Sequence, residues 1–375
     1  MTTYLDMNAT SPVLREVADL VYKYLIEDFG NAGSRTHEFG AKAKAAVNQA
    51  RKQVANVVEA DVSEVIFTSG ATESNNIALL GLKSFGEKEN KRHIITTRIE
   101  HKAVLEPIEH LANVGFDVTY LNVGENGVVD PNELAASLRE DTLLVSIMHV
   151  NNETGSIQPI EQICQVLSSS DAYLHVDAAQ SYGKLSESLK NSRIDLLSAS
   201  GHKVYAPKGI GALIMRRRGF IKPPLKPIMF GGGQEKNLRP GTLAVPLIAG
   251  FGLACELASK NSDKWESHAL GLKESLIAEL DKVGAQYNGD NSSPYVLNFS
   301  VPGVNSESLM VALKGIAAVS NGSACTSSSY SPSHVLKAMG LSEDRINGAV
   351  RISWSGMQEK LPVMEIVAKI EQVRL

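Results

Sequence analysis

The chain reads Ser200-Gly201-His202-Lys203 directly after a short apolar run at 196–199. Such a run is typical of a buried strand, and the small polar residues after it predict a turn. A lysine at this position can offer its amine to the carbonyl group of a bound molecule. Taken alone, Lys203 would be interpreted as a solvated loop lysine, so its meaning depends on the segments around it.

Two upstream segments supply the other parts of a site. His175-Val176-Asp177 ends a second strand candidate with a carboxylate, and residues 68–76 (TSGATESNN) have the pattern of a strand end, a glycine turn at Gly70 and a helix start. The free N–H groups of a helix start favour a phosphate, and an aspartate facing a ring nitrogen is the usual partner of pyridoxal phosphate. Asp177 could instead cap a helix, but together the three segments predict one pyridoxal-phosphate site.

Short apolar runs alternate with helical segments along the first two thirds of the chain. Strands separated by helices predict an α/β fold whose mainly parallel sheet is covered on both faces and binds ligands at its strand ends. Beyond Thr242 we expect helices at 243–258 and 263–283, a strand at 296–300 and a helix at 306–313. The seven expected strands of the sheet are 65–67, 93–96, 118–121, 143–148, 173–176, 196–199 and 212–215.

Composition narrows the class of protein. With 37 Lys and Arg against 41 Asp and Glu, the formal net charge is −4, which argues against direct binding of nucleic acid or of an anionic membrane over a broad surface. Arg216-Arg217-Arg218 remains a candidate for a local basic patch. The amino terminus has no secretory signal pattern and no apolar run is long enough to span a membrane, so we expect a cytoplasmic protein.

The three cysteines differ in their surroundings. Cys164 and Cys255 lie in segments with helical periodicity and are expected to be core residues. Cys325 lies among Gly, Ser and Pro residues that indicate a loop, where it is a candidate nucleophile. Three cysteines in 375 residues do not suggest a disulfide framework, and the histidine spacings do not suggest a zinc site, so we expect no intrinsic metal.

These motifs, taken in order, resemble the group I (NifS/IscS-like) cysteine desulfurases of the class V, fold-type I pyridoxal-phosphate enzymes. The resemblance extends over almost the whole chain. Its further landmarks are residues 4–10 (YLDMNAT), 29–31 (FGN), 34–37 (SRTH), 148–155 (MHVNNETG), 239–242 (RPGT), 322–327 (GSACTS) and 350–353 (VRIS).

The resemblance implies a fold-type I transferase with a seven-stranded sheet in a large domain, 14–255, and a smaller α+β domain, 1–13 and 256–375. It implies that Lys203 holds the cofactor and moves a proton, that His101 stacks on the cofactor ring, and that the thiolate of Cys325 takes sulfur from L-cysteine to form a persulfide. The cofactor-binding residues that it implies are Gly70, Ala71, Thr72, His101, Asn152, Asp177, Gln180, Ser200, His202, Lys203 and Thr242, and the substrate-binding residues are Asn152 and Arg351.

The same resemblance implies a homodimer, with Thr242 reaching the cofactor of the neighbouring subunit, and a protein that accepts the sulfur. Two acceptors are open. One is an iron–sulfur scaffold, on which Cys325 could contact a nascent cluster. The other is a partner in DNA phosphorothioation, because residues 33–37 (GSRTH) and the segment around Cys325 are similar to desulfurases of that pathway, while the short stretch after Arg351 departs from the scaffold-serving members.

Three other functions fit parts of the pattern. A selenocysteine lyase or a class V aminotransferase would share the cofactor site but would not need Cys325 in the same way. A sulfur-relay scaffold protein without catalysis would keep only the fold. Absorbance from lysine-bound cofactor separates this last alternative from the enzymes.

Overall fold

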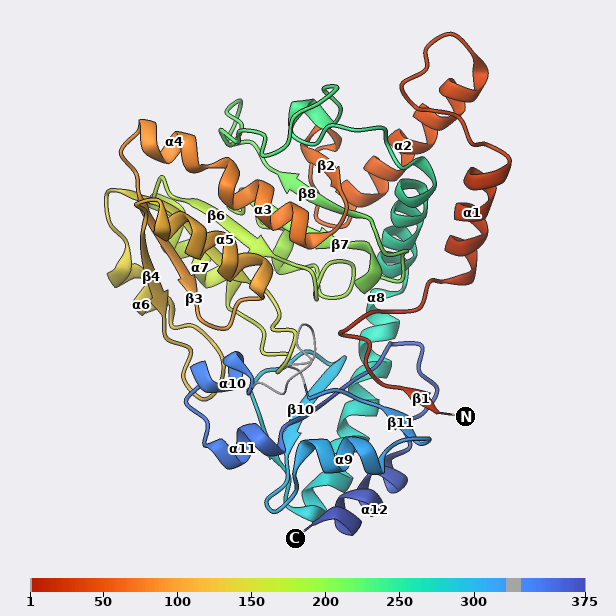
Figure 1. The fold of residues 1–375 in the computed structure, drawn as a ribbon, viewed down its shortest axis with the longest axis vertical. Helices are drawn as coiled ribbons and strands as arrows, with labels where there is room; N and C mark the ends of the chain where they lie inside the picture. The colour runs from red at the N-terminus through yellow and green to blue at the C-terminus, as the bar shows by residue number, and fades with distance from the viewer. Residues whose placement is uncertain (1, 322–331, 375) are drawn as a thin grey trace.

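The computed structural model describes residues 2–321 and 332–374, and a seven-stranded sheet lies at the centre of the larger, upper part in Figure 1. The strand order is β2-β8-β7-β6-β5-β3-β4, and every neighbouring pair is parallel except those of β8. All seven expected strands are present within one residue of their predicted ends, so the α/β prediction is confirmed. The strands are β2 (Val65–Thr68), β3 (His93–Thr97), β4 (Asp117–Leu121), β5 (Thr142–Met148), β6 (Tyr173–Asp177), β7 (Leu196–Ser200) and β8 (Gly211–Met215).

Strand β8 runs antiparallel to both of its neighbours, β2 and β7. The chain between β7 and β8 contains only the short turn η4 (Gly201–Lys203) and no α-helix. A parallel connection needs a long crossover, usually a helix, so this short connection returns β8 in the opposite direction. The alternation of strands and helices that predicts parallel pairs fails at this one connection.

Helices cover both faces of the sheet, which explains why its central strands are apolar on both sides. One face packs against α3 (Ala71–Gly81) and α5 (Lys102–Asn113). The other packs against α2 (Glu38–Asn56), α7 (Ile160–Val166) and the first part of α8 (Val245–Leu280). The remaining helices of this part are α1 (Arg15–Ile26), α4 (Lys83–Lys88) and α6 (Pro131–Ser137).

Helix α8 is one continuous helix of 36 residues, so the prediction of two helices separated near residues 259–262 is wrong. Polar residues at this place suggested a break. In the structure they bond back to the helix itself: Asn261 Nδ2 donates to the Leu257 carbonyl (2.8 Å) and Ser262 Oγ to the Ser259 carbonyl (3.1 Å). With no Gly or Pro at this place, the backbone has no reason to leave the helix.

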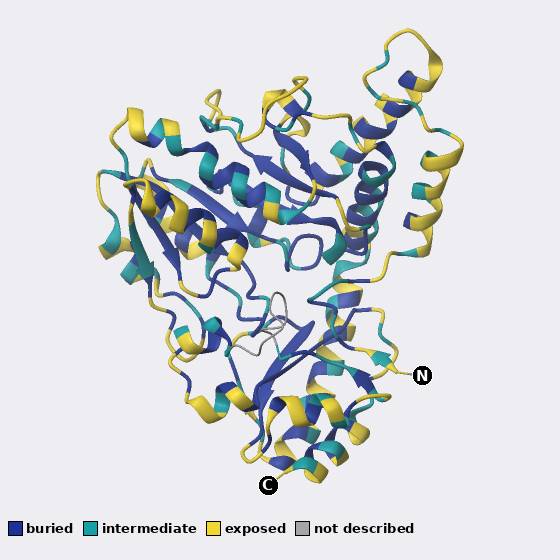
Figure 2. Ribbon diagram, in the orientation of Figure 1, coloured by how far each residue is buried: buried dark blue, intermediate teal, exposed yellow. Residues whose placement is uncertain are grey.

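The part of the molecule drawn below the main sheet in Figure 1, called the lower part, consists mainly of the end of α8 and the elements that follow it. It has its own apolar core around a three-stranded antiparallel sheet, order β12-β10-β9. Helix α8 enters both cores: Trp265 belongs to the first and Ala269 to the second. Figure 2 shows buried residues continuing through this junction. The two-domain division expected at residue 255 stays a prediction. The elements are β9 (Gln286–Tyr287), β10 (Val296–Ser300), α9 (Ser306–Ala312), α10 (His334–Ala338), α11 (Glu343–Gly348), β12 (Val350–Ser353), α12 (Val363–Val373) and the pair β1 (Thr3–Tyr4) with β11 (Ala317–Ala318).

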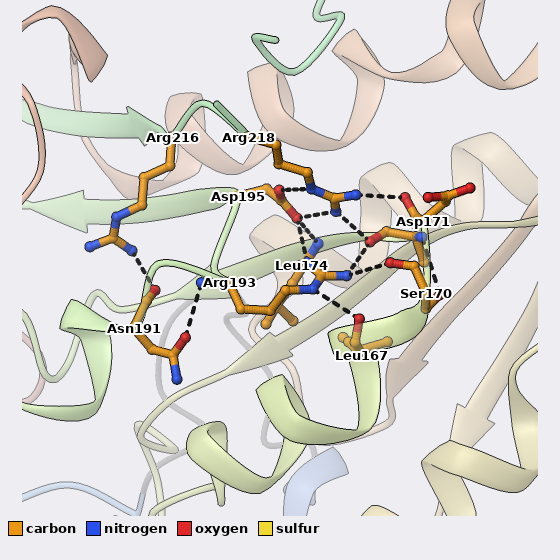
Figure 3. A network of polar contacts seen from close by, with 10 residues as sticks. Leu167, Ser170, Asp171, Leu174, Asn191, Arg193, Asp195, Arg216 and Arg218 are labelled. Atoms are coloured by element: carbon orange, nitrogen blue, oxygen red, sulfur yellow. Dashed lines mark hydrogen bonds and ion pairs between the residues drawn. The ribbon is translucent and has the colours of Figure 1, made fainter. Parts of the chain in front are cut away.

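Arg216 and Arg218 belong to a network of polar contacts inside the fold (Figure 3), and Arg217 forms ion pairs with Asp61 and Glu64, so the run at 216–218 is not an open basic patch. Asp195, which is 2% exposed, accepts hydrogen bonds from Arg218 Nε (2.6 Å) and Arg193 Nη1 (2.9 Å). Arg216 is buried and donates to the carbonyls of Val58 (2.6 Å) and Leu189 (2.9 Å). These guanidinium groups satisfy buried acceptors between the sheet and its loops, so their role is structural.

Within residues 2–321 and 332–374, none of the helices is both long enough and apolar enough to cross a membrane.

Candidate active site

A cavity of about 410 Å³ lies at the carboxyl ends of β5, β6 and β7, next to the start of α3. This is where open α/β sheets bind ligands. The cavity brings together almost all of the residues predicted for the site, although they come from distant parts of the sequence. The predicted residues that line it are Gly70, Ala71, Thr72, His101, Asn152, Asp177, Gln180, Ser200, His202, Lys203 and Arg351.

The turn before α3 is shaped to receive a phosphate. Gly70 has φ +153, a backbone conformation that residues with a side chain rarely adopt. The first hydrogen bond of the helix runs from the Ser74 N–H to the Gly70 carbonyl (3.1 Å). The amides of residues 71–73 therefore precede that bond and have no partner one turn back in the helix. Such amides, together with the positive end of the helix dipole, favour an anion.

Asp177 is the last residue of β6 and is 5% exposed. Its Oδ1 accepts the Ala179 N–H (2.9 Å), and its Oδ2 accepts Asn75 Nδ2 (2.8 Å). The carboxylate is therefore held in one orientation at the wall of the cavity. Sequence reasoning missed Asn75, whose only signal is its place in the same TSGATESNN segment as the phosphate turn.

Lys203 ends the turn that follows β7. Its Nζ donates to the backbone carbonyls of Asn8 and Ala9, the latter at 2.8 Å. The Asn8 carbonyl also accepts Gln180 Nε2 (3.0 Å), and Asn8 Nδ2 donates to the Asn152 carbonyl (3.1 Å). Asn8 therefore connects three predicted site residues. Sequence reasoning gave it no role, although it lies in the recognised segment at 4–10.

His101 is the N-cap residue of α5 and lines the cavity. Its Nδ1 accepts the Ala103 N–H (3.0 Å), so the proton of the neutral ring is on Nε2. Desolvation by the surrounding walls lowers the pKa of His101 from its ordinary value; Asp177 opposes this shift and Lys203 adds to it. The imidazole is therefore mostly neutral at pH 7, with an Nε2–H that can donate a hydrogen bond or a proton, while its Nδ1 lone pair is used by the Ala103 N–H.

Glu100, beside His101, is a second group that sequence reasoning missed. It is completely buried, and its Oε1 accepts the Met148 N–H (2.9 Å) and the Thr97 hydroxyl (3.0 Å). Burial raises the pKa of Glu100 to about 8, so the carboxyl is mostly protonated at pH 7. It holds the end of β5 against the turn that carries His101. Its only signal in the sequence is its position next to that histidine.

Arg351 comes to the cavity from β12 of the lower part and is 4% exposed. Its Nη1 donates to the Asn152 carbonyl (2.8 Å) and its Nη2 to Asp6 Oδ1 (2.6 Å). Its Nε is buried without a hydrogen-bond partner among the described residues. These bonds use two of the five N–H groups of the guanidinium, and Arg351 lines the cavity, so it is placed to bind a carboxylate.

Of the predicted site residues that the structure describes, only Thr242 does not line this cavity. Thr242 is exposed outside it, between β8 and α8. Cys325 lies outside the described residues. Cys164 and Cys255 are buried in α7 and α8, as predicted. Burial raises the pKa of Cys164 to about 11 and that of Cys255 further, so neither thiol ionises readily at neutral pH.

The residues of the cavity fit pyridoxal phosphate. The anion-binding turn at Gly70 and the oriented carboxylate of Asp177 both line the cavity. Lys203 lines it as well, and its amine is held by the carbonyls of Asn8 and Ala9. Asn75 Oδ1 and Gln180 Oε1 are buried beside Asp177 with no partner within the described residues. Both are acceptor atoms, and buried acceptors are costly unless a ligand or water donates to them.

Comparison with known proteins agrees with this geometry. Residues 3–360 match the family described as aminotransferase class-V. The chain is 45% identical to "Cysteine desulfurase IscS" of Vibrio atlanticus, over 98% of this chain and 91% of that protein. Among solved structures, a NifS-like protein matches with TM-score 0.89 and 37% identity, covering 100% of this chain and 98% of that one. DndA from Streptomyces lividans matches with TM-score 0.83 and 52% identity, covering 94% and 99%.

Proposed function

The chain belongs to the aminotransferase class-V family, and from that premise we propose that it is a pyridoxal-phosphate-dependent cysteine desulfurase. It converts L-cysteine to L-alanine and passes the sulfur to an acceptor protein. The observation that carries the proposal is the placement of Lys203, Asp177 and the phosphate turn around one cavity that also receives Arg351. A lysine, an aspartate and an anion cradle are the parts that this cofactor requires.

Pyridoxal phosphate, when bound, supplies an aldehyde and a ring that stabilises negative charge beside the Cα of an amino acid. The amides at 71–73 would bind its phosphate. Asp177, oriented by Asn75 and Ala179, would hold a proton on the ring nitrogen. Gln180 and Asn152 would donate to the ring oxygen. Each of these groups is fixed by the ends of buried strands, so little rearrangement is needed on binding.

For the substrate, Arg351 would bind the carboxylate of L-cysteine and thereby aim the Cα proton toward the Lys203 amine. Lys203 Nζ would take that proton, and His101 Nε2 would exchange a proton with the reacting thiol. Cys325 is the proposed nucleophile because the two other cysteines are buried and hard to ionise.

The sulfur transfer balances without an external oxidant. The thiolate of Cys325 attacks the substrate sulfur; the substrate C–S bond breaks and an S–S bond forms. The substrate carbon is reduced to the methyl group of alanine and receives a proton, while the two sulfur atoms are oxidised to the persulfide. Transfer of the outer sulfur to the acceptor then returns the cysteine thiol.

We propose a homodimer in which Thr242 completes the cofactor site of the neighbouring subunit. In support, Thr242 is exposed away from its own cavity, and exposed apolar side chains occur on the same segment between β8 and α8, including Phe220, Ile221 and Phe230. Exposed apolar side chains of this kind are common at subunit interfaces.

The sulfur acceptor is one of the two expected from the sequence, an iron–sulfur scaffold or a DNA phosphorothioation partner. The chain is similar to both IscS and DndA relatives, so the comparisons do not distinguish between the two acceptors. Adding each purified acceptor to the enzyme with L-cysteine would show which one takes the sulfur. The expected cytoplasmic location also stays a prediction.

The proposed activity is tested by measuring alanine released from L-cysteine in the presence of a thiol that accepts the sulfur. Alanine and sulfide should appear in equal amounts, and purified protein should show the near-visible absorption of lysine-bound cofactor. Lys203→Ala should lose that absorption and the activity. Lys208→Ala, which changes an exposed lysine at the edge of the same cavity, should keep both.

The competing functions give different results in the same assay. A selenocysteine lyase would release alanine from L-selenocysteine but little from L-cysteine. An aminotransferase would need a keto acid and would release no sulfide. A protein without the absorption band would be a relay scaffold, and the enzyme proposal would be wrong.

A further inference from the structure

An acidic side chain lies inside the phosphate turn itself. Glu73 is in the first turn of α3, directly after Thr72, and it lines the cavity together with Gly70 and Ala71. Its Oε2 accepts the Ser69 N–H (2.5 Å), and its Oε1 accepts Arg239 Nε (3.0 Å). Glu73 is 13% exposed and Arg239 27% exposed, so this ion pair is largely shielded from water.

Glu73 is charged at neutral pH. Burial would raise the pKa of this carboxyl, but the hydrogen bonds from Ser69 and the Arg239 guanidinium outweigh that effect and hold the pKa below its ordinary value. The turn that is to bind a phosphate therefore carries a charge of the same sign as its ligand. In a site partly shielded from solvent, such a repulsion is substantial.

Arg239 is the basic residue that offsets this charge. Within residues 2–321 and 332–374, it forms the only ion pair with Glu73. We propose that Arg239 is a positioning residue of the cofactor site: it neutralises and orients Glu73, so that the turn at Gly70 can hold the phosphate of pyridoxal phosphate. The inference rests on the proposed function and adds to it a requirement that lies outside the predicted site residues.

The position of Arg239 is fixed by a separate anchor. Glu235 accepts the Phe67 N–H of β2 (2.7 Å) and forms two hydrogen bonds with Arg51, to Nη1 (2.8 Å) and Nη2 (2.5 Å). Because β2 is an edge strand of the sheet, this carboxylate takes the place of a neighbouring strand at Phe67.

The backbone at this anchor is unusual. Glu235, Lys236 and Asn237 all have positive φ values, 43, 60 and 66. Non-glycine residues adopt this conformation only where surrounding contacts enforce it, and the buried contacts of Glu235 do so here. Arg239 therefore follows a segment that Glu235 anchors to β2, and its Nε reaches Glu73 from there.

The test is a double-mutant cycle on cofactor affinity, measured by titrating cofactor-free protein with pyridoxal phosphate and following absorbance. Arg239→Gln leaves Glu73 uncompensated and should weaken binding by about tenfold or more. Glu73→Gln keeps an acceptor for the Ser69 N–H but no charge, and should bind at least as tightly as wild type. The double variant should recover the affinity of Glu73→Gln. Inorganic phosphate, used as a competitor, should show the same order of affinities.

Two controls separate this role from general stability. Arg239→Lys keeps the charge and should bind pyridoxal phosphate better than Arg239→Gln. The affinity lost in Arg239→Gln should also shrink at high salt, since the repulsion is electrostatic. Circular dichroism and sedimentation of each cofactor-free variant check that fold and assembly are retained.

Unchanged affinity in Arg239→Gln would overturn the inference. So would a double variant as weak as Arg239→Gln, because Arg239 would then act through something other than the charge of Glu73. Failure of the wild-type protein to bind pyridoxal phosphate would instead contradict the proposed function, so the two failures are distinguishable.

Discussion

At the scale of single residues, the site is made by hydrogen bonds between segments that are far apart in the sequence. Asn75 orients Asp177, and the carbonyl of Asn8 meets both Lys203 and Gln180. The sequence predicts the residues that carry a known chemical task because each lies in a recognisable local motif. It does not predict Asn8, Asn75 or Glu100, since their roles depend on neighbours that only the folded chain supplies.

Arg351 allows the proposed substrate contact to be tested. Arg351→Lys keeps a positive charge but loses the planar fork, and Arg351→Ala loses both. The loss of a buried charged partner should cost Arg351→Ala about 2–4 kcal/mol of transition-state binding, seen as a fall in kcat/KM for L-cysteine. Arg351→Lys should lie between this variant and wild type. Equal kcat/KM in all three proteins would contradict the role of Arg351.

Glu100 gives a prediction about stability and pH. Its pKa is about 8 in the folded chain and about 4.5 when free, so between these values unfolding releases a proton. The contribution of Glu100 is therefore fully present below about pH 4.5 and is lost as the pH rises through 8. Glu100→Gln cannot titrate. Relative to wild type, its free energy of unfolding should rise by about 1.4 kcal/mol per pH unit in this range, as measured by urea unfolding. Parallel pH profiles would rule out the buried protonated carboxyl.

At the scale of elements, the strands could be predicted and two connections could not. Apolar runs buried on both faces identify all seven strands of the main sheet, but the direction of β8 depends on the short chain between it and β7. The continuity of α8 depends on side chains that bond within the helix, at Asn261 and Ser262, where composition alone suggested a loop.

The continuity of α8 can be tested at Asn261. Proline inside a helix removes a backbone hydrogen bond and clashes with the preceding turn, so Asn261→Pro should lower the free energy of unfolding by about 3 kcal/mol or more. Asn261→Ala loses only the bond to the Leu257 carbonyl and gains helix propensity, so it should stay within about 1 kcal/mol of wild type. If both variants unfolded at the same urea concentration as wild type, a break at 259–262 would be the better description.

At the scale of the whole molecule, the proposed site requires contributions from both cores and from a second chain. Sedimentation should show a dimer at micromolar concentration. Thr242→Ala should remain dimeric but retain pyridoxal phosphate less well, because the proposed contact to the neighbouring phosphate is lost. A control, Thr242→Ser, keeps the hydroxyl and should retain the cofactor. A fully active monomer would contradict the shared site.

The most direct test of the central claim is to map the sulfur after L-cysteine is added to the purified holoenzyme without an acceptor. Mass spectrometry should find one extra sulfur on the peptide that contains Cys325, with one alanine released for each persulfide formed. Cys325→Ser should show neither product, while Cys164→Ser and Cys255→Ser should show both. A persulfide on Cys164 or Cys255, or alanine formed at the wild-type rate by Cys325→Ser, would contradict the account.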